Sequence, residues 1–154
     1  MTNPPRAAIR RLGAGDVAAM RALNALFGAV FDDPESYAQA PPSDGWLTAR
    51  LSDPTFIALV AERDGETVGG LVAYVLRKCE RERAEVYIYD LAVVESARRQ
   101  GVATALIEAL KPVARAAQAW VIYVQADYVD PPAIALYEKL GRREEVLHFD
   151  IDVD

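Results

Sequence analysis

Residues 95–104 have types and a spacing that suit the binding of a pyrophosphate group. They connect a β-rich run to an amphipathic run, so we expect a turn from a strand into a helix. The first N–H groups of a helix have no intrahelical partner and lie at the positive end of its dipole, so they bind phosphate where no side chain blocks the approach. Gly101 and Ala103 leave that space free, and Thr104 adds a hydroxyl.

The basic residues of the same segment add charge but do not complete a common nucleotide motif. Arg98 and Arg99 are long enough to reach phosphate groups. The segment has neither the Gly-Lys-Ser/Thr of a Walker loop nor the Gly-x-Gly-x-x-Gly fingerprint, so nucleotide hydrolysis and hydride transfer lose support. Taken in isolation, these residues fit an ordinary strand-to-helix turn with solvated arginines equally well. The neighbouring elements are therefore needed to distinguish a pyrophosphate site from an ordinary turn.

Cysteine and histidine chemistry has little basis in this chain. The single Cys79 allows no intramolecular disulfide and no metal-ligand spacing, and the single His148 removes most triad and zinc chemistry. We therefore expect no metal, and a reaction that uses carboxylates, phenols and backbone amides.

The composition is that of a soluble globular protein, with 52% hydrophobic and 26% charged residues. We expect residues 1–154 to form a single domain. No apolar run reaches the roughly 18 residues of a membrane span, and the start of the chain lacks a signal-peptide pattern, so we predict a cytoplasmic protein with no membrane partner. The net charge of −6 disfavours a nucleic-acid partner and favours a cationic or neutral one.

Hydrophobic periodicity predicts the order β α α β β β α β α β, a mixed sheet with helices on both sides. Asp16 is expected to cap the first helix, and Asp64-Gly65 to close a hairpin. The expected strands are residues 7–11, 56–61, 67–76, 85–94, 120–126 and 146–151. The expected helices begin near residues 17 and 43, span residues 102–118, and begin again at residue 131, ending at Gly141.

The end of the strand at residues 85–94 and the turn that follows it resemble a motif of a known family. Leu91-Ala92-Val93 followed by Arg98-x-x-Gly101-x-Ala103 resembles the Q/R-x-x-G-x-G/A acetyl-CoA motif of GNAT-superfamily N-acetyltransferases, and the element order matches as well. The resemblance implies an α/β (α+β) fold with a mixed, mostly antiparallel sheet of about six or seven strands, a V-shaped splay and about four helices. It also implies acetyl-CoA as co-substrate, held by Leu91, Ala92, Val93, Arg98, Arg99, Gln100, Gly101, Val102, Ala103 and Thr104.

Two residues are the candidates for catalysis. Amide formation from a thioester needs an unprotonated amine and an acid for the departing thiolate. Tyr137 lies in a segment that resembles the superfamily's helix whose Tyr hydroxyl sits beside the cofactor sulfur, so we predict it as general acid; a core aromatic residue is the alternative. Asp90 immediately precedes Leu91, where an acidic residue commonly orients or deprotonates the amine in this superfamily. The sequence leaves open whether Asp90 is base or ammonium anchor.

Acidic residues gather in residues 32–53 and 144–154, regions that border the acceptor site in this superfamily. Opposed acidic walls attract a polycation, whereas solvated surface charge is the alternative for any one residue. The predicted substrate-binding residues are Asp90, Asp127, Asp150 and Glu35.

The longest resemblance, from about Ile9 to Asp152, is to the type I aminoglycoside 3-N-acetyltransferases, and it is most specific in residues 143–152. It implies direct acetyl transfer, without an acyl-enzyme, to the 3-amino group of the deoxystreptamine ring of gentamicin-like drugs, with antibiotic resistance as the outcome. Residues 32–53 match least, so the resemblance bears on the reaction type more than on the range of drugs.

Two other functions stay open, namely a GNAT enzyme that acetylates a polyamine or another small amine, and a non-catalytic acetyl-CoA-binding regulator. The oligomeric state also stays open. Relatives of this size are often dimers, and the closing strand could pair across an interface, so a homodimer is one of the states allowed.

Overall fold

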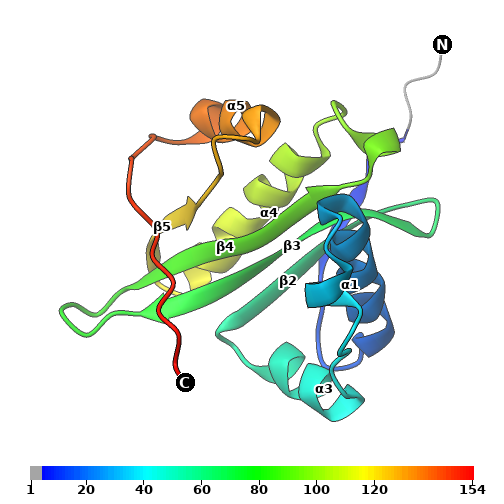
Figure 1. Ribbon diagram of the computed structural model, residues 1–154, viewed down its shortest axis with the longest axis horizontal. Coiled ribbons are helices and arrows are strands. Elements are labelled where there is room, and N and C mark those ends of the chain that lie inside the picture. The colour runs from blue at the N-terminus through cyan, green and yellow to red at the C-terminus, as the bar shows by residue number, and fades with distance from the viewer. Residues whose placement is uncertain (1–4) are drawn as a thin grey trace.

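A computed structural model describes residues 5–154 and shows a single twisted sheet with helices on both faces (Figure 1). The sheet has the order β1-β2-β3-β4-β5, in which the first four strands are antiparallel and β5 runs parallel to β4. This confirms the predicted mixed α/β class. The strands are β1 (Ala8–Arg11), β2 (Phe56–Arg63), β3 (Glu66–Arg77), β4 (Ala84–Val93) and β5 (Ala119–Val124).

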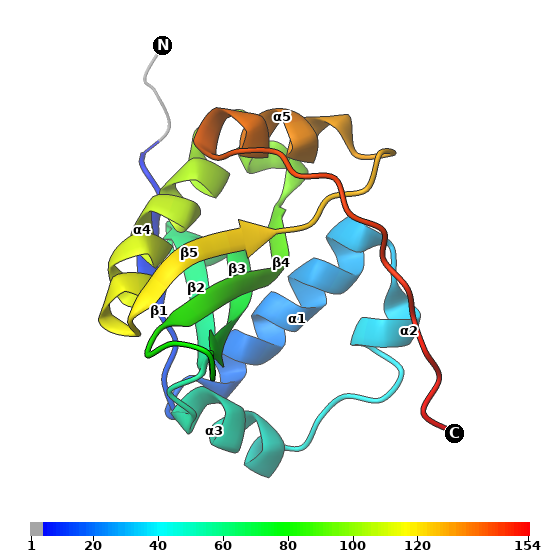
Figure 2. The same cartoon turned by 90° about the vertical axis from the view of Figure 1, so that its left-hand side faces the viewer.

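The helices lie on opposite sides of this sheet. Figure 2 shows α1 on one face and α4 on the other. The helices are α1 (Val17–Phe31), α2 (Pro34–Tyr37), α3 (Asp44–Ser52), α4 (Val102–Ala116) and α5 (Pro131–Leu140), with a 3-10 turn at η1 (Glu95–Ala97). We call the side covered by α1 and α3 the α1 face, and the side covered by α4 the α4 face.

Each face of the sheet has its own hydrophobic core, which explains why the central strands are almost continuously apolar. On β2, Ile57 and Leu59 belong to the core beneath α4, whereas Ala58 and Val60 belong to the core beneath α1. All four side chains are at most 2% exposed. Successive residues of a strand point to opposite faces, so both sets must be apolar.

The expected hairpin between β2 and β3 is confirmed. Asp64 and Gly65 both have positive φ angles, 53° and 81°, as a two-residue turn of type I′ requires. Asp16 is the N-cap residue of α1, as expected, but its side chain makes no capping hydrogen bond, because its carboxylate is engaged elsewhere. It accepts a hydrogen bond from the Gly13 N–H at 2.7 Å and binds Arg10 at 2.9 Å, and the first of these bonds contributes most to lowering the pKa of Asp16.

The final part of the chain differs most from expectation. The predicted strand at residues 146–151 is not formed, so the described residues contain five strands instead of six or seven; α2 raises the number of helices to five. A strand needs a partner for its N–H and C=O groups, and residues 141–154 run beside no strand that pairs with them. Of the helices described, none combines the length and apolar character that crossing a membrane requires.

Candidate active site

The turn before α4 exposes backbone groups that suit an anion. Gly101 adopts a left-handed conformation with φ of 76°, and a Cβ added there would meet nothing within 4 Å. No side chain among the described residues caps α4, so the N–H groups of Val102, Ala103 and Thr104 stay free. Arg99 also has a positive φ of 59°, which is unfavourable for a side chain of this size and is typical of functional turns. The turn therefore fits a pyrophosphate.

The polar side chains of this turn hold it in place as well as flank it. The Arg98 Nε donates to the Val93 carbonyl at 3.2 Å and so ties the turn to the end of β4. Gln100 donates to the Ser96 carbonyl at 3.0 Å and accepts from Arg63 at 2.8 Å. Arg98 thus has a structural contact beside its predicted role toward phosphate.

The sheet opens between β4 and β5 beside this turn. Pairing with β5 ends where Ile88 meets Val124, whereas pairing of β4 with β3 continues to Val93. The backbone of Leu91, Ala92 and Val93 therefore has no strand partner on its β5 side. This gap is the V-shaped splay that the resemblance implied, and its free N–H and C=O groups suit an extended amide-containing chain.

An irregularity in β4 decides which way Asp90 points. Val72 of β3 pairs with Asp90 and the next residue pairs with Ile88, so Tyr89 is an extra residue in a β-bulge. Ile88 and Leu91 both pack in the core beneath α4. Strict alternation would have turned Asp90 toward α4 as well. Because the bulge inserts one residue, Asp90 lies on the α1 face instead.

On that face Asp90 meets a residue that the sequence did not reveal. The Tyr37 hydroxyl of α2 donates to Asp90 Oδ1 at 2.7 Å. Burial raises the pKa of Asp90, and the hydrogen bond from Tyr37 lowers it by less. Burial and the neighbouring carboxylate also raise the pKa of Tyr37, so its hydroxyl keeps its proton and remains a donor.

Tyr37 is held by aromatic packing against α1. Its ring lies 6.0 Å from that of Phe27 and 5.9 Å from that of Phe31. A Cβ at Gly28 would lie 3.0 Å from the Tyr37 Cβ, so this glycine permits the close approach. The sequence contains no periodic signal for a helix as short as α2. The aromatic residues of α1 together with Gly28 are the nearest to a signal.

A row of aromatic rings extends from Asp90 across the α1 face of the sheet. The rings of Tyr87 and Tyr123 stack at 4.7 Å, and Tyr89 meets both Tyr87 and Tyr74, at 5.7 and 6.0 Å. Phe56 continues the row at 5.7 Å from Tyr74. Aromatic faces attract cations and pack against the apolar faces of sugar rings. We call these five residues the aromatic floor.

Tyr137 lies on the opposite side of the splay. It sits on α5, half-buried, and packs against the core beneath α4. Burial, with a smaller contribution from Asp130, raises the pKa of Tyr137 to about 12. The phenol therefore holds its proton at neutral pH. Asp90 and Tyr137 approach the splay from different faces of the sheet.

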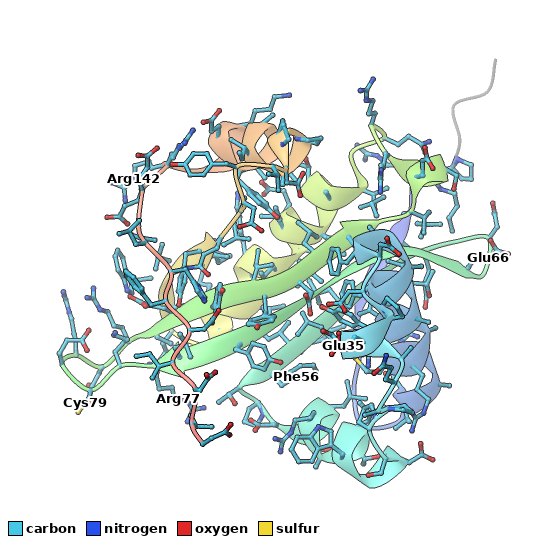
Figure 3. All side chains as sticks on the ribbon, in the orientation of Figure 1. Glu35, Phe56, Glu66, Arg77, Cys79 and Arg142 are labelled. Carbon is cyan, nitrogen blue, oxygen red and sulfur yellow. The ribbon has the colours of Figure 1, made fainter. Side chains whose placement is uncertain are left out.

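The remaining predicted substrate-binding residues are spread unevenly. Glu35 is exposed on α2, two residues from Tyr37, and Figure 3 shows it in front of the sheet. Asp127 is exposed in the loop after β5. Asp150 lies in the exposed C-terminal segment, paired only with His148 at 2.9 Å, so this chain does not bring it to Asp90. The His148 side chain is itself 64% exposed.

The positions of the cysteine and of the potential metal ligands agree with the small role that the sequence gives them. Cys79 is exposed at the far tip of the β3–β4 hairpin (Figure 3). Residues 5–154 hold no group of three or more His, Cys, Asp or Glu side chains that could bind a metal ion. The expectation that the reaction needs no metal stays a prediction.

Comparison with known proteins gives a family and several relatives. Residues 17–141 match the sequence profile described as "Acetyltransferase (GNAT) family". The uncharacterized N-acetyltransferase YhfO of Bacillus subtilis (strain 168) is 30% identical over 124 residues, which cover 77% of this chain and 83% of that protein. An N-alpha-acetyltransferase of Sulfurisphaera tokodaii is 34% identical over 92 residues, which span 55% of each protein and so only about half of that relative.

Two solved structures are similar over almost the whole chain. One is an aminoglycoside acetyltransferase from an uncultured soil metagenomic sample, with a TM-score of 0.94 and 52% identity over 97% of this chain and 100% of that one. The other is a second aminoglycoside acetyltransferase from such a sample, in complex with sisomicin, with a TM-score of 0.88 and 32% identity over 96% of this chain and 97% of that one.

The burial of Asp90 predicts a pH-dependent gain in stability when its charge is removed. Because the folded pKa of Asp90 is raised, the folded protein holds this proton more tightly than the unfolded chain does. The contribution of Asp90 to the free energy of unfolding is therefore greatest below its pKa in the unfolded chain. It falls as the pH rises through its pKa in the folded protein. Asp90→Asn keeps an acceptor for Tyr37 without the charge. We expect its Tm to exceed that of the wild type at neutral pH, and the difference to shrink as the pH falls towards about 4.

Differential scanning calorimetry across this pH range measures the effect. Asp127→Asn is a matched control, because loss of an exposed surface charge should change Tm little. A Tm for Asp90→Asn that stays below that of the wild type at neutral pH would show that the buried carboxylate stabilises the fold.

Proposed function

Because the chain belongs to the Acetyltransferase (GNAT) family, we propose that it transfers an acetyl group from acetyl-CoA to the 3-amino group of the deoxystreptamine ring of gentamicin-like aminoglycosides. The observation that carries this proposal is the full-length similarity to two soil metagenomic aminoglycoside acetyltransferases. A half-buried carboxylate beside the aromatic floor supports a cationic, ring-shaped acceptor. Antibiotic resistance would follow from the loss of a positive charge on the drug.

Acetyl-CoA supplies the acetyl group as a thioester, and the residues of the turn and splay fit its parts. The free N–H groups of residues 102–104 would bind the pyrophosphate, with Arg98, Arg99 and Gln100 around it. The unpaired backbone of Leu91, Ala92 and Val93 would pair with the amides of the pantetheine arm. The open space at Gly101 allows this approach, because a Cβ there would meet no neighbour and no side chain covers the helix start.

The two faces of the sheet would then serve two substrates. The start of α4 and Tyr137 lie toward the α4 face, whereas Asp90 lies on the α1 face. The donor would reach the splay from one side and the acceptor from the other. Asp90 would bind the acceptor ammonium and take its proton, directly or through water, because burial makes this carboxylate a stronger base. Tyr137 would give its proton to the departing thiolate.

An assay of thiol release with gentamicin, spermidine and a peptide amine tests the acceptor. We expect turnover with gentamicin, and NMR of the product should place the acetyl group on the 3-amino nitrogen. Transfer to spermidine with none to any aminoglycoside would replace the proposal with a polyamine acetyltransferase. Tight acetyl-CoA binding without transfer to any amine would indicate a regulatory protein.

The general acid is tested by Tyr137→Phe. Loss of the proton donor should lower kcat by roughly 10² or more, as general acids contribute, with the Kd for acetyl-CoA little changed. Tyr128→Phe is the matched control, because Tyr128 is 74% exposed and removal of its hydroxyl should leave kcat near that of the wild type. Full turnover by Tyr137→Phe would assign the acid role to another group.

The contact between Tyr37 and Asp90 predicts a shift in the pH profile of kcat/KM. The Tyr37 hydroxyl stabilises the Asp90 carboxylate, so Tyr37→Phe should raise the pKa of Asp90 further. The base then ionises at higher pH, and the acidic limb of the profile should move to higher pH in Tyr37→Phe. Asp90→Asn should lose this limb altogether, which assigns the limb to Asp90. An acidic limb that moves to lower pH, or not at all, would contradict the inference that the Tyr37 hydroxyl lowers the pKa of Asp90.

A further inference from the structure

Arg50 carries a charge that no ion pair of the described chain neutralises. It lies on α3, partly buried, with its guanidinium 5.0 Å from the centre of the Trp46 ring. Its Nε atom is buried and has no hydrogen-bond partner among residues 5–154. None of the salt bridges within these residues includes Arg50. The charge and part of the donor capacity of this guanidinium are therefore available to a ligand.

The acidic residue at the end of the same helix is engaged elsewhere. Asp53 follows α3, and its Oδ1 accepts hydrogen bonds from the N–H and the hydroxyl of Thr55, at 2.8 and 2.7 Å. These bonds contribute most to lowering the pKa of Asp53, and the charges of Arg50 and Arg77 lower it further. Two cations thus lie near one carboxylate, so this part of the surface keeps a positive charge.

Arg50 lies at the β2 end of the aromatic floor. Leu51, the next residue of α3, packs in the same core as Phe56 of β2. Phe56 pairs with Tyr74, and Tyr74 pairs with Tyr87, so the floor crosses the strands at one level of the sheet. Since neighbouring strands lie about 5 Å apart, the β2 and β4 ends of the floor are separated by about 10 Å.

The two ends of the floor carry opposite charges. Burial contributes most to raising the pKa of Tyr74, Asp90 raises it further, and Arg50 lowers it. The Tyr74 hydroxyl is therefore within electrostatic reach of both charges. Figure 3 shows Glu35 on the α1 side of this surface and Arg77 toward the β3–β4 hairpin. Glu35 thus adds negative charge on the side of Asp90, and Arg77 adds positive charge on the side of Arg50.

We propose that Arg50 determines acceptor specificity by binding a hydroxyl or another oxygen-bearing group about 10 Å from the amine that Asp90 binds, the width of two strand spacings. This inference rests on the proposed function, because it takes the α1 face as the acceptor side. Hydroxyl and carboxylate oxygens accept hydrogen bonds from a guanidinium, whereas an ammonium is repelled by it. The preferred acceptor is therefore an amine whose far end is rich in oxygen, as in a sugar, and a polyamine with a cation at each end is disfavoured.

Two ligands of one length test this preference without acetyl transfer. The ω-amino acid and the α,ω-diamine of octane place a carboxylate or a second ammonium about 10 Å from the amine, which matches two strand spacings. NMR titration measures the Kd of each, and we expect the wild type to bind the amino acid more tightly. Arg50→Gln should weaken binding of the amino acid and strengthen binding of the diamine, each by about fivefold, as one contact between unit charges in water contributes.

Matched controls separate the charge of Arg50 from its packing on Trp46. Arg50→Lys keeps the charge and should keep the preference for the amino acid. Arg81→Gln removes the same charge from the exposed β3–β4 hairpin and should leave both Kd values within about twofold of the wild type. The amino acid and the diamine of butane are too short to reach Arg50, so Arg50→Gln should not change their relative binding.

Two outcomes would overturn the proposal. One is a wild type that binds the octane diamine as tightly as the amino acid of the same length. The other is a preference that Arg50→Gln leaves unchanged, because the discrimination would then come from another group.

Kinetics connect this preference to turnover. In the assay of thiol release, Arg50→Gln should raise the KM for gentamicin relative to that for spermidine by about fivefold, with kcat little changed. An unchanged ratio of the two KM values would overturn the role of Arg50 in acceptor choice. Absence of acetyl transfer by the wild type to any amine would instead refute the proposed function, and the binding preference, which is measured without transfer, would stand.

Discussion

One extra residue in β4 determines how the rest of the site is arranged. Up to Ile88 the strand keeps its alternation and pairs with a strand on each side. At Tyr89 a bulge reverses the alternation, and beyond it β4 keeps only its partner β3. Bulges increase local twist, which is consistent with the loss of β5 at this point. The same step exposes backbone groups at Leu91–Val93 and turns Asp90 toward the α1 face, so both halves of the site depend on it.

The sequence revealed the elements whose composition reports a general physical condition. Strands covered on both faces must be apolar throughout, and a turn with two positive φ angles favours Asp64-Gly65, so β2 and β3 could be predicted. The bulge could not. In β4 the buried residues Val86 and Ile88 alternate with less buried ones, and the next aliphatic residue, Leu91, comes three positions later. This break in the alternation does not by itself identify the extra residue, because an ordinary strand end gives the same pattern. Asp90 was identified by its place in a motif, and its orientation needed the structure.

Tyr37 and Asp16 show a second limit of sequence patterns. Tyr37 lies on a helix of one turn, too short for periodicity, and its contact with Asp90 spans 53 residues of sequence. Asp16 has the type and position of a cap, but the Gly13 N–H and Arg10 compete for its carboxylate. In both cases the polar group forms hydrogen bonds with partners that only the folded chain brings together. The predicted strand at residues 146–151 is similar, because its amphipathic pattern is present but a strand exists only with a partner.

The two-sided arrangement addresses an electrostatic conflict in the proposed reaction. Acetyl-CoA carries several negative charges, whereas an aminoglycoside is a polycation, and side by side they would attract each other in unproductive ways. Here Arg98 and Arg99 flank the start of α4, and Glu35 and Asp90 lie on the α1 face, with the apolar sheet between them. Charges of opposite sign are thus kept apart except at the splay. There the acceptor must lose a proton before it can attack, and a carboxylate made more basic by burial is suited to accept it.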